Sequence, residues 1–274
     1  STNNKVTLAS SATFDTLTID GTSGQADTLS LGSSGYTLKL ANAGSTANVL
    51  TISGTLTAGT STVEFASTNT SGTVTVPALT YSSLTFSGNE TYAAAGDMTV
   101  SGTLTMSDGT FVAPSGTLSL GGSFANNSGF NANGGTAALT ASSGTKTITM
   151  ASGSFANLSL TGGATWSLSS NITATGTVSI TSGTLSQGAK SITAGALTVN
   201  GGTFSGGSGA FDVNGALTIS SGTMTAPSGD TTVSGNFIHS GGTFSHNTGT
   251  IVLDGGDQTL SGGTTFYSLK KTGS

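Results

Sequence analysis

The residues that could do chemistry in this sequence are few and poorly clustered. There are eleven acidic residues and no arginine, and the closest candidate pair, Asp254 and Asp257, spans a turn that contains two glycines. Polysaccharide hydrolases and lyases need carboxylates gathered on one face together with a cationic side chain. The pair therefore favours turn chemistry. We expect no enzyme activity, no catalytic residue and no cofactor.

Metal ligands are equally sparse. Asp254 and Asp257 offer too few carboxylates for a calcium site on their own. Residues 206–212, GGSGAFD, approach the calcium-binding nonapeptide pattern only once, with the aspartate one place late. His239 and His246 lie seven residues apart in the inward alternating phase, and no third ligand accompanies them. We expect no metal site, and we expect both histidines to be polar residues near corners.

Threonine pairs give the one suggestive surface pattern. Residues 55–57, 103–105 and 223–225 each read Thr-x-Thr, which places two threonines on the outward face of one strand. Flat arrays of such pairs resemble ice-binding faces. Many equivalent positions read Ala-x-Thr, Thr-x-Ser or Gly-x-Ser instead. A solvated β surface is therefore favoured, and an ice-binding face is a lesser alternative.

The composition is unusual for a chain of this length. Glycine accounts for 43 of 274 residues and charged residues for 6%, while serine and threonine together make up roughly a third. Such a bias can indicate a disordered linker. A linker, however, has no reason to place an apolar residue at every second position within short segments, whereas a strand packed on one face requires it.

A repeat of about twenty residues organises the chain most clearly over 195–274. These residues divide into four twenties opened by Gly195, Gly215, Gly235 and Gly255, with apolar residues in nearly fixed columns. A fixed period of this kind is typical of a solenoid. Within each twenty, glycines about seven residues apart predict three sides. We expect these corner glycines to supply a positive φ.

Between the corners the apolar residues alternate. Segments 216–219 and 250–253 predict strands in which every second residue, such as Leu217 and Ile219, points inward. Trp166 shares the inward phase and is expected in the core. No window has the spacing of an amphipathic helix. The sequence therefore predicts an all-β, three-sided parallel β-solenoid with about 20 residues per coil and about 13–14 coils.

Residues 1–274 are expected to form one continuous solenoid with a longer internal period. The pattern of an aromatic residue, two residues, leucine, three residues and glycine begins at Phe14, Tyr81, Phe155 and Phe266, so blocks end near 21, 88, 162 and 273. Residues 22–88 are less regular. Strands there are expected at 28–31, 36–40, 49–52, 62–65, 73–76 and 84–86.

Charge and hydropathy exclude several classes of partner. The net charge is −5 and the lysines are scattered, apart from Lys270 and Lys271, so there is no electrostatic footprint for nucleic acid. No apolar run approaches the length of a membrane span. The chain has no cysteine and no recognisable signal peptide. We expect an exported protein at the cell surface or outside the cell, with its export signal absent from this chain.

The repeats GTLTMSDGTF, SGSFANLSLTGG and GGTFSHNTGTIVLDGGDQTLSGGTTFYSLKKTG resemble those of bacterial β-strand-repeat surface proteins, akin to filamentous-haemagglutinin-like and autotransporter adhesins. The resemblance covers the whole chain. It implies an exported β-helix that serves as an adhesin, fibre or cell coat. No catalytic residue carries over, because the family pattern contains none.

The pattern is interrupted at both ends of the chain, and we expect unpaired strand edges there, which either recruit another chain or are buried by continuation of the solenoid. The favoured function is a non-enzymatic structural subunit or segment of an extracellular filament, sheath or stalk, with a second copy or neighbouring repeats as its partner. The alternative is an adhesin or autotransporter-type passenger that binds surface glycans or a host or abiotic surface. The residues expected to mediate self-association are Val6, Leu8, Phe14, Leu17, Leu260, Phe266 and Leu269.

Overall fold

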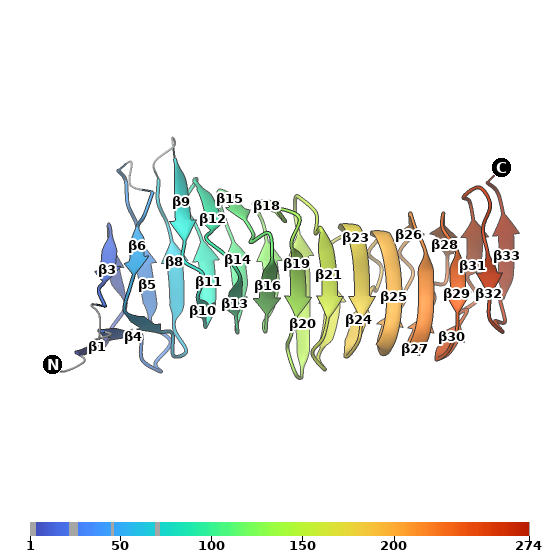
Figure 1. Ribbon diagram of the computed structural model, residues 1–274, viewed down its shortest axis with the longest axis horizontal. Coiled ribbons are helices and arrows are strands. Elements are labelled where there is room, and N and C mark those ends of the chain that lie inside the picture. The colour runs from blue at the N-terminus through green and yellow to red at the C-terminus, as the bar shows by residue number, and fades with distance from the viewer. Residues whose placement is uncertain (1–3, 22–26, 45–46, 69–71, 274) are drawn as a thin grey trace. The chain divides into compact units, whose positions relative to one another are not determined.

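The chain folds as an all-β, parallel β-solenoid of about 13 coils with roughly 20 residues per coil (Figure 1). The computed structural model describes residues 4–21, 27–44, 47–68 and 72–273. The few remaining residues, including the first three of the expected first coil, lie outside the described part. Within the described ranges there is no helix. The chain divides into two compact units, residues 1–135 and 136–274, and each is described by itself.

Unit 1 consists of strands that follow one another around three sides, which we call the first, second and third side in chain order. The described residues of this unit form eighteen strands, three to a coil, in six coils. The second side is a continuous parallel ladder from β2 to β17. The strands are β1 (Lys5–Thr7), β2 (Ala12–Phe14), β3 (Leu17–Ile19), β4 (Thr28–Ser30), β5 (Thr37–Leu40), β6 (Leu50–Ile52), β7 (Thr55–Thr57), β8 (Thr62–Phe65), β9 (Thr73–Val76), β10 (Thr80–Tyr81), β11 (Ser83–Phe86), β12 (Thr91–Ala94), β13 (Met98–Val100), β14 (Leu104–Met106), β15 (Thr110–Val112), β16 (Thr117–Leu120), β17 (Phe124–Asn126) and β18 (Gly129–Asn131).

Unit 2 repeats the same three-sided course. Its first side begins with β19, its second with β20, and its third includes β26, β28, β31 and β33. Three of its strands, β23, β25 and β27, run through corners and so belong to more than one side. The strands are β19 (Thr136–Leu139), β20 (Thr145–Met150), β21 (Asn157–Leu160), β22 (Thr165–Leu168), β23 (Ile172–Ile180), β24 (Thr184–Ser186), β25 (Ile192–Ser205), β26 (Phe211–Val213), β27 (Leu217–Thr225), β28 (Asp230–Val233), β29 (Phe237–His239), β30 (Thr243–Ser245), β31 (Thr250–Leu253), β32 (Leu260–Ser261) and β33 (Ser268–Lys271).

The core of each unit is built from the inward residues of these short strands. Leu217, Ile219 and Trp166 are fully buried, as the alternation predicts. In unit 1 the aromatic rings of successive coils contact one another, with centroids 5.8 Å apart for Phe65 and Phe86 and 4.7 Å apart for Phe86 and Phe111. All six strands expected between residues 22 and 88 are present, to within one residue at each end. Period-two alternation was therefore a sufficient signal even where the glycine spacing is irregular.

The expected role of the corner glycines is wrong for most of them. Gly222 and Gly242 have the positive φ values of 75° and 80° that glycine favours, but Gly195 and Gly209 do not. At these two positions a Cβ atom would instead collide with the backbone carbonyl oxygens of Thr175 and Lys190. The close stacking of coils, more than the turn conformation, excludes a side chain there.

The last of the four twenties does not keep its expected register. Leu197 pairs with Leu217 and Leu217 with Phe237, which are steps of twenty residues. Phe237 then pairs with Leu260, twenty-three residues on, and Leu253 pairs with Lys271, eighteen residues on. The step to β32 is long because the segment 254–259 makes a longer turn before that strand begins. The step to β33 is short, so the added residues are offset within the same coil.

Val252 keeps the outward phase expected over 250–253 but is more buried than expected, with only 8% of its surface exposed. Thr232 and Lys270 are its ladder neighbours in the adjacent coils. These neighbours flank Val252 on both sides and restrict its access to solvent.

The recurring aromatic-x-x-leucine pattern marks a corner each time, but not the same corner. Residues 14–17 and 266–269 pass from the second side to the third within their units. Residues 81–84 pass from the first side to the second, and residues 155–158 from the third to the first. The first and last coils therefore share the corner at which this pattern falls.

Candidate functional site

The histidines and acids singled out in the sequence serve local structure. His239 Nδ1 lies 2.9 Å from Thr264 Oγ1, and His246 Nδ1 accepts a 3.1 Å hydrogen bond from the Thr248 amide. Asp254 accepts a 2.8 Å hydrogen bond from Ser234 Oγ in the neighbouring coil. Across the described residues, no three His, Cys, Asp or Glu side chains lie together in a way that could hold a metal ion.

One buried acid went unnoticed in the sequence. Glu90 is 4% exposed and its Oε1 atom has no hydrogen-bond partner. Nearby, Tyr92 donates from its hydroxyl to the Ser67 carbonyl at 3.2 Å. Burial, and then the charge of Glu90, raise the pKa of Tyr92 well above its usual value. The charge of Asp108 adds to this shift, and among the described residues no group of three His, Cys, Asp or Glu side chains gathers here to hold a metal ion.

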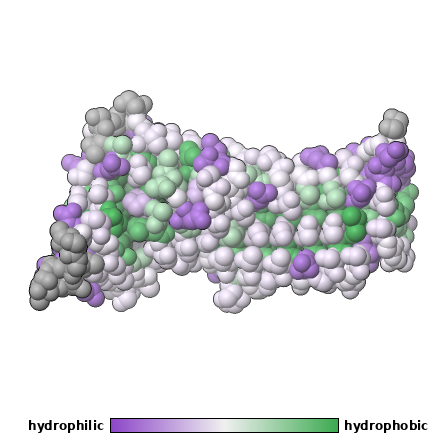
Figure 2. Space-filling model, viewed as in Figure 1, coloured by the Kyte–Doolittle hydropathy of each residue, from purple (hydrophilic) through white to green (hydrophobic). Residues whose placement is uncertain are grey.

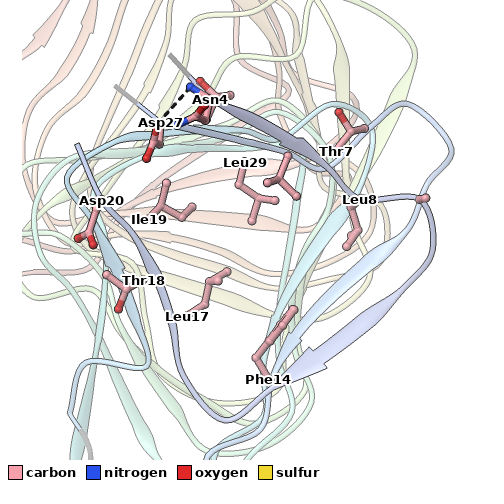
Figure 3. A pocket seen from close by; sticks show the side chains of 13 residues that line it. Asn4, Thr7, Leu8, Phe14, Leu17, Thr18, Ile19, Asp20, Asp27 and Leu29 are labelled. Atoms are coloured by element: carbon pink, nitrogen blue, oxygen red, sulfur yellow. Dashed lines mark hydrogen bonds between the residues drawn. The ribbon is translucent and has the colours of Figure 1, made fainter. Parts of the chain in front are cut away.

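An apolar hollow opens on the first coil of unit 1 (Figure 3). It has a volume of about 450 Å³. Figure 3 shows Leu8, Phe14, Leu17, Ile19 and Leu29 around a common space, with Asp20 and Asp27 at its edge. We call this surface, including Val6, the N-face. The exposed fractions of Val6 and Phe14 are 65% and 38%.

The N-face exists because the strands of this coil have a described neighbour on one side only. β1 pairs with β4, β2 with β5 and β3 with β6. The inward side chains of the coil are therefore covered from one direction. Their strand edges also carry backbone groups without a described ladder partner on the other side, which is the property that allows another strand to add.

A second apolar surface lies on the last coil of unit 2. Here β32 pairs with β29, and β33 with β31, and neither has a ladder partner on its other side among the described residues. Leu260 is 41% exposed, Leu269 43% and Tyr267 65%. Phe266 is half-buried, because its ring packs against Phe237 at 5.3 Å and Phe244 at 5.8 Å. We call the surface of these four residues, with Lys271, the C-face.

Lys271 is a part of the C-face that the sequence analysis missed. It pairs with Leu253, so it stands in the inward phase, where earlier coils place apolar residues. Its Nζ donates to the carbonyls of Gly255 and Gly273, at 2.6 and 2.8 Å. The ammonium group is thereby held at the corner that follows β33. Lys270, one residue earlier, is exposed.

The two end faces hold all the large apolar side chains that are exposed in the described part of the chain. These are Val6 and Phe14 on the N-face and Leu260, Tyr267 and Leu269 on the C-face. Of the seven residues predicted from sequence, four are in this set and the other three, Leu8, Leu17 and Phe266, are half-buried beside them. Tyr267 was not predicted, since its position reads as the outward neighbour of Phe266.

The outward residues on the second side of unit 2 are all hydroxylic over six coils. One column is threonine throughout, running from Thr145 through 165, 184, 203 and 223 to Thr243. The parallel column, from Thr147 to Ser245, holds only serine and threonine at residues 147, 167, 186, 205, 225 and 245. We call these two columns the hydroxyl face. The residue between each pair points inward.

The other two sides of unit 2 have mixed outward residues. The first side includes Asn157, Ala196 and Ile238, and the third includes Asp212 and Lys270. Figure 2 shows one face of the molecule, and much of that face is near-neutral in hydropathy, with scattered hydrophilic and hydrophobic residues. The first side has one hydroxyl column over four coils, Ser159, Ser179, Thr198 and Thr218. Two parallel hydroxyl columns over six coils distinguish the second side.

The three Thr-x-Thr pairs do not share one face. Residues 55–57 lie on the first side of unit 1, in the sheet formed by β1, β4 and β7. Residues 103–105 lie on its second side at β14, where other coils place Lys39 and Glu64. Residues 223–225 belong to the hydroxyl face of unit 2. The regular array is thus made mainly of Thr-x-Ser segments, which the sequence analysis read as interruptions.

A shallow polar hollow of about 460 Å³ lies on the first side of unit 1, over β10, β13 and β16. Asp97 is its one carboxylate, and its Oδ1 atom accepts a 2.8 Å hydrogen bond from the Thr117 amide. Threonine and serine make up most of the remaining lining, and no aromatic ring lines it. The hollow thus lacks the flat apolar platform on which sugar rings stack.

Comparisons with known proteins found no match for this chain. No protein-family model matches the chain, and neither does a curated protein or a solved structure. The part of the chain that the structure describes contains no helix of the length and hydropathy needed to cross a membrane.

Proposed function

We propose that this chain is a non-enzymatic structural unit of an extracellular or cell-surface filament, sheath or stalk, and that it associates end to end through its N-face and C-face. The observation that carries the proposal is the confinement of exposed large apolar side chains to these two faces. Contiguous exposed apolar surface on a soluble protein marks a site of association.

The chemistry of the two faces supports an asymmetric contact. Each face combines open strand edges with inward side chains of a single coil, so that one more coil would continue both the ladder and the core. The contact would join two different surfaces. Head-to-tail contacts between different surfaces generate open filaments when the rotation does not close a ring. A filament or stalk is therefore the assembly that follows.

Sedimentation and negative-stain electron microscopy of the 274-residue chain test this proposal. We expect elongated assemblies that grow with protein concentration. Leu269→Asp should raise the concentration for half-assembly at least tenfold, because it places an unpaired carboxylate in the contact. Thr198→Asp, an outward change on the first side of unit 2, is the matched control and should assemble like the wild type. A wild type that remains monomeric up to its solubility limit would overturn the proposal.

The hydroxyl face favours a second candidate function, the binding of an ordered, hydroxyl-bearing or aqueous lattice such as ice. Each hydroxyl donates one hydrogen bond and accepts others. Neighbouring coils repeat them about every 4.8 Å, and the two columns of one strand stand roughly 6.6 Å apart. Many weak contacts on one rigid face add to a strong attachment. Apart from Thr147, the hydroxyls of this face make no hydrogen bond to another described residue.

Ice-affinity partitioning and recrystallisation assays test this second candidate. We expect the wild type to be enriched in the ice fraction, and Thr203→Tyr to abolish enrichment, because the ring would stand in the middle of the flat face. Thr198→Tyr, on the first side, is the control and should bind like the wild type. Exclusion of the wild type from ice would overturn this candidate. A glycan array read in parallel separates it from a sugar-binding adhesin.

A further inference from the structure

We propose that the C-face of one copy docks on the N-face of a second copy in a single register, with Leu269 over Leu17, and that opposite charges at two corners select this register. The inference rests on the proposed end-to-end association and names its geometry. It follows from the order of apolar and charged residues around the two coils.

The apolar residues match at a constant offset of 252 residues. With Leu269 over Leu17, Phe266 lies over Phe14 and Leu260 over Leu8. Both aromatic-x-x-leucine segments pass from the second side to the third within their units. A ladder between the two coils would therefore place a ring beside a ring and a leucine beside a leucine, in the way that successive coils already pair in the core.

The charged residues match at the same offset. Asp257, at the corner before β32, lies over Lys5, at the start of β1. At the other corner, Lys271 lies over Ile19, immediately before Asp20. Asp257, Lys5 and Asp20 are exposed on their own faces. Opposite charges attract more strongly at a partly desolvated contact than in bulk water, because the local dielectric is lower.

The hydrogen bonds of Lys271 place its charge where the register needs it. Its Nζ is held by the carbonyls of Gly255 and Gly273, and Gly273 lies over Gly21, the neighbour of Asp20. The ammonium group and the Asp20 carboxylate therefore meet at one corner. Lys270, in the outward phase over Thr18, adds a second positive charge beside them.

Other registers are disfavoured by the same residues. A slip of one residue would turn Phe14 and Leu17 to the opposite phase relative to Phe266 and Leu269. A slip of two residues would keep the phase, but it would move Asp257 away from Lys5 and shift Phe266 from Phe14 to Ala12 or Thr16. Electrostatic complementarity of this kind fixes register and steers encounter more than it adds affinity.

Charge exchange between the faces tests the register. The N-face variant Lys5→Asp/Asp20→Lys and the C-face variant Asp257→Lys/Lys270→Asp/Lys271→Asp should each raise the concentration for half-assembly at least tenfold at low salt. The combined variant should return to within about threefold of the wild type, because the charges are opposite again. Asp230→Lys, an exposed change away from both faces, is the control, and thermal melting checks that every variant folds.

Cysteine cross-linking tests the register independently of charge, because the chain has no native cysteine. Thr18→Cys and Lys270→Cys are outward positions that the register stacks about 4.8 Å apart, within disulfide reach. Mixed copies should cross-link under diamide, while Thr18→Cys mixed with Thr259→Cys should not. If the wild type assembles but neither the charge exchange nor the cross-link behaves in this way, the register is wrong and end-to-end association stands. A monomeric wild type overturns both.

Discussion

Lys39 Nζ lies 2.8 Å from Glu64 Oε1, and Ser87 Oγ donates to the same oxygen at 2.6 Å. The three residues come from successive coils on the second side of unit 1, so one carboxylate ties three coils together. This is the one ion pair among the described residues. It shows how little of the stability of this solenoid depends on charge and how much must come from burial and backbone ladders.

The Glu64 interaction predicts a pH-dependent contribution to stability. Burial of Glu64 alone would raise its pKa, but the hydrogen bonds from Lys39 and Ser87 and the charge of Lys39 outweigh burial and hold its pKa below the usual 4.5. A carboxyl pKa that is lower in the folded than in the unfolded state stabilises above the ordinary pKa. This stabilisation is lost as the pH falls through the lowered value.

Glu64→Gln should therefore destabilise the protein near neutral pH, by less than about 1 kcal/mol, because Lys39 is partly exposed. Urea unfolding at neutral pH and at a pH well below 4.5 measures the effect. The difference in the free energy of unfolding between Glu64→Gln and the wild type should be smaller at acid pH than at neutral pH. A difference that grows on acidification would contradict this account.

Phe86 is the residue whose truncation should cost most in unit 1. Its ring centroid lies 4.7 Å from that of Phe111 and 4.9 Å from that of Tyr92, so it contacts two coils. Phe86→Ala should lower the free energy of unfolding by about 3–5 kcal/mol. Thr85→Ala, the outward neighbour, should change it by no more than about 0.5 kcal/mol. Equal losses of unfolding free energy for Phe86→Ala and Thr85→Ala, measured by chemical denaturation, would show that the ring contacts contribute little to stability.

The buried side chain of Gln187 stabilises a corner of unit 2 through hydrogen bonds to backbone carbonyls. It is fully buried, and its Nε2 donates to the carbonyls of Lys190, Gly209 and Ala210 at 2.9, 3.0 and 3.0 Å. Gln187→Leu should destabilise the protein by about 1–3 kcal/mol, because buried carbonyls lose their donor. Ser186→Ala, one residue earlier on the surface, is the control. A leucine variant as stable as the control would mean that water replaces the amide.

Two corner glycines of unit 2 should respond oppositely to alanine. At Gly209 a Cβ would collide with the Lys190 backbone, whereas at Gly229 it would meet nothing within 4 Å. Gly209→Ala should destabilise by more than about 1 kcal/mol, since backbone must shift. Gly229→Ala should be neutral or stabilise by up to about 1 kcal/mol, through the entropy of the unfolded chain. Thermal melting of the two variants compares them directly.

The strands, their phase and the three-sided coil were predictable from sequence because alternation is a local property. Leu217, Ile219 and Trp166 needed no knowledge of their neighbours to be assigned to the core. Register is different, because it depends on how many residues each corner holds. The longer turn at 254–259 moved the partner of Phe237 to Leu260, and nothing in a fixed twenty-residue alignment could foresee it.

The faces were predicted less completely than the strands. Residue type alone identified Val6 and Leu269 as candidates for association, but Tyr267 and Lys271 required the actual pairing of β33 with β31. The hydroxyl face was missed for a related reason. Whether Thr203 and Ser205 form an array depends on which side of the coil they share with Thr184 and Thr223, and only the ladder registers decide this.

Stacking of this kind also determines how a unit responds to tension. Each coil bonds only to the coils next to it, so a pulling force applied along the stack would remove coils one after another from an end, as in other repeat proteins. A coil holds roughly 20 residues and occupies about 4.8 Å of the stack, but drawn out fully it spans roughly 65 Å. Under tension the solenoid would therefore lengthen coil by coil, and a coil of this size would add a length more than ten times its own thickness in the stack.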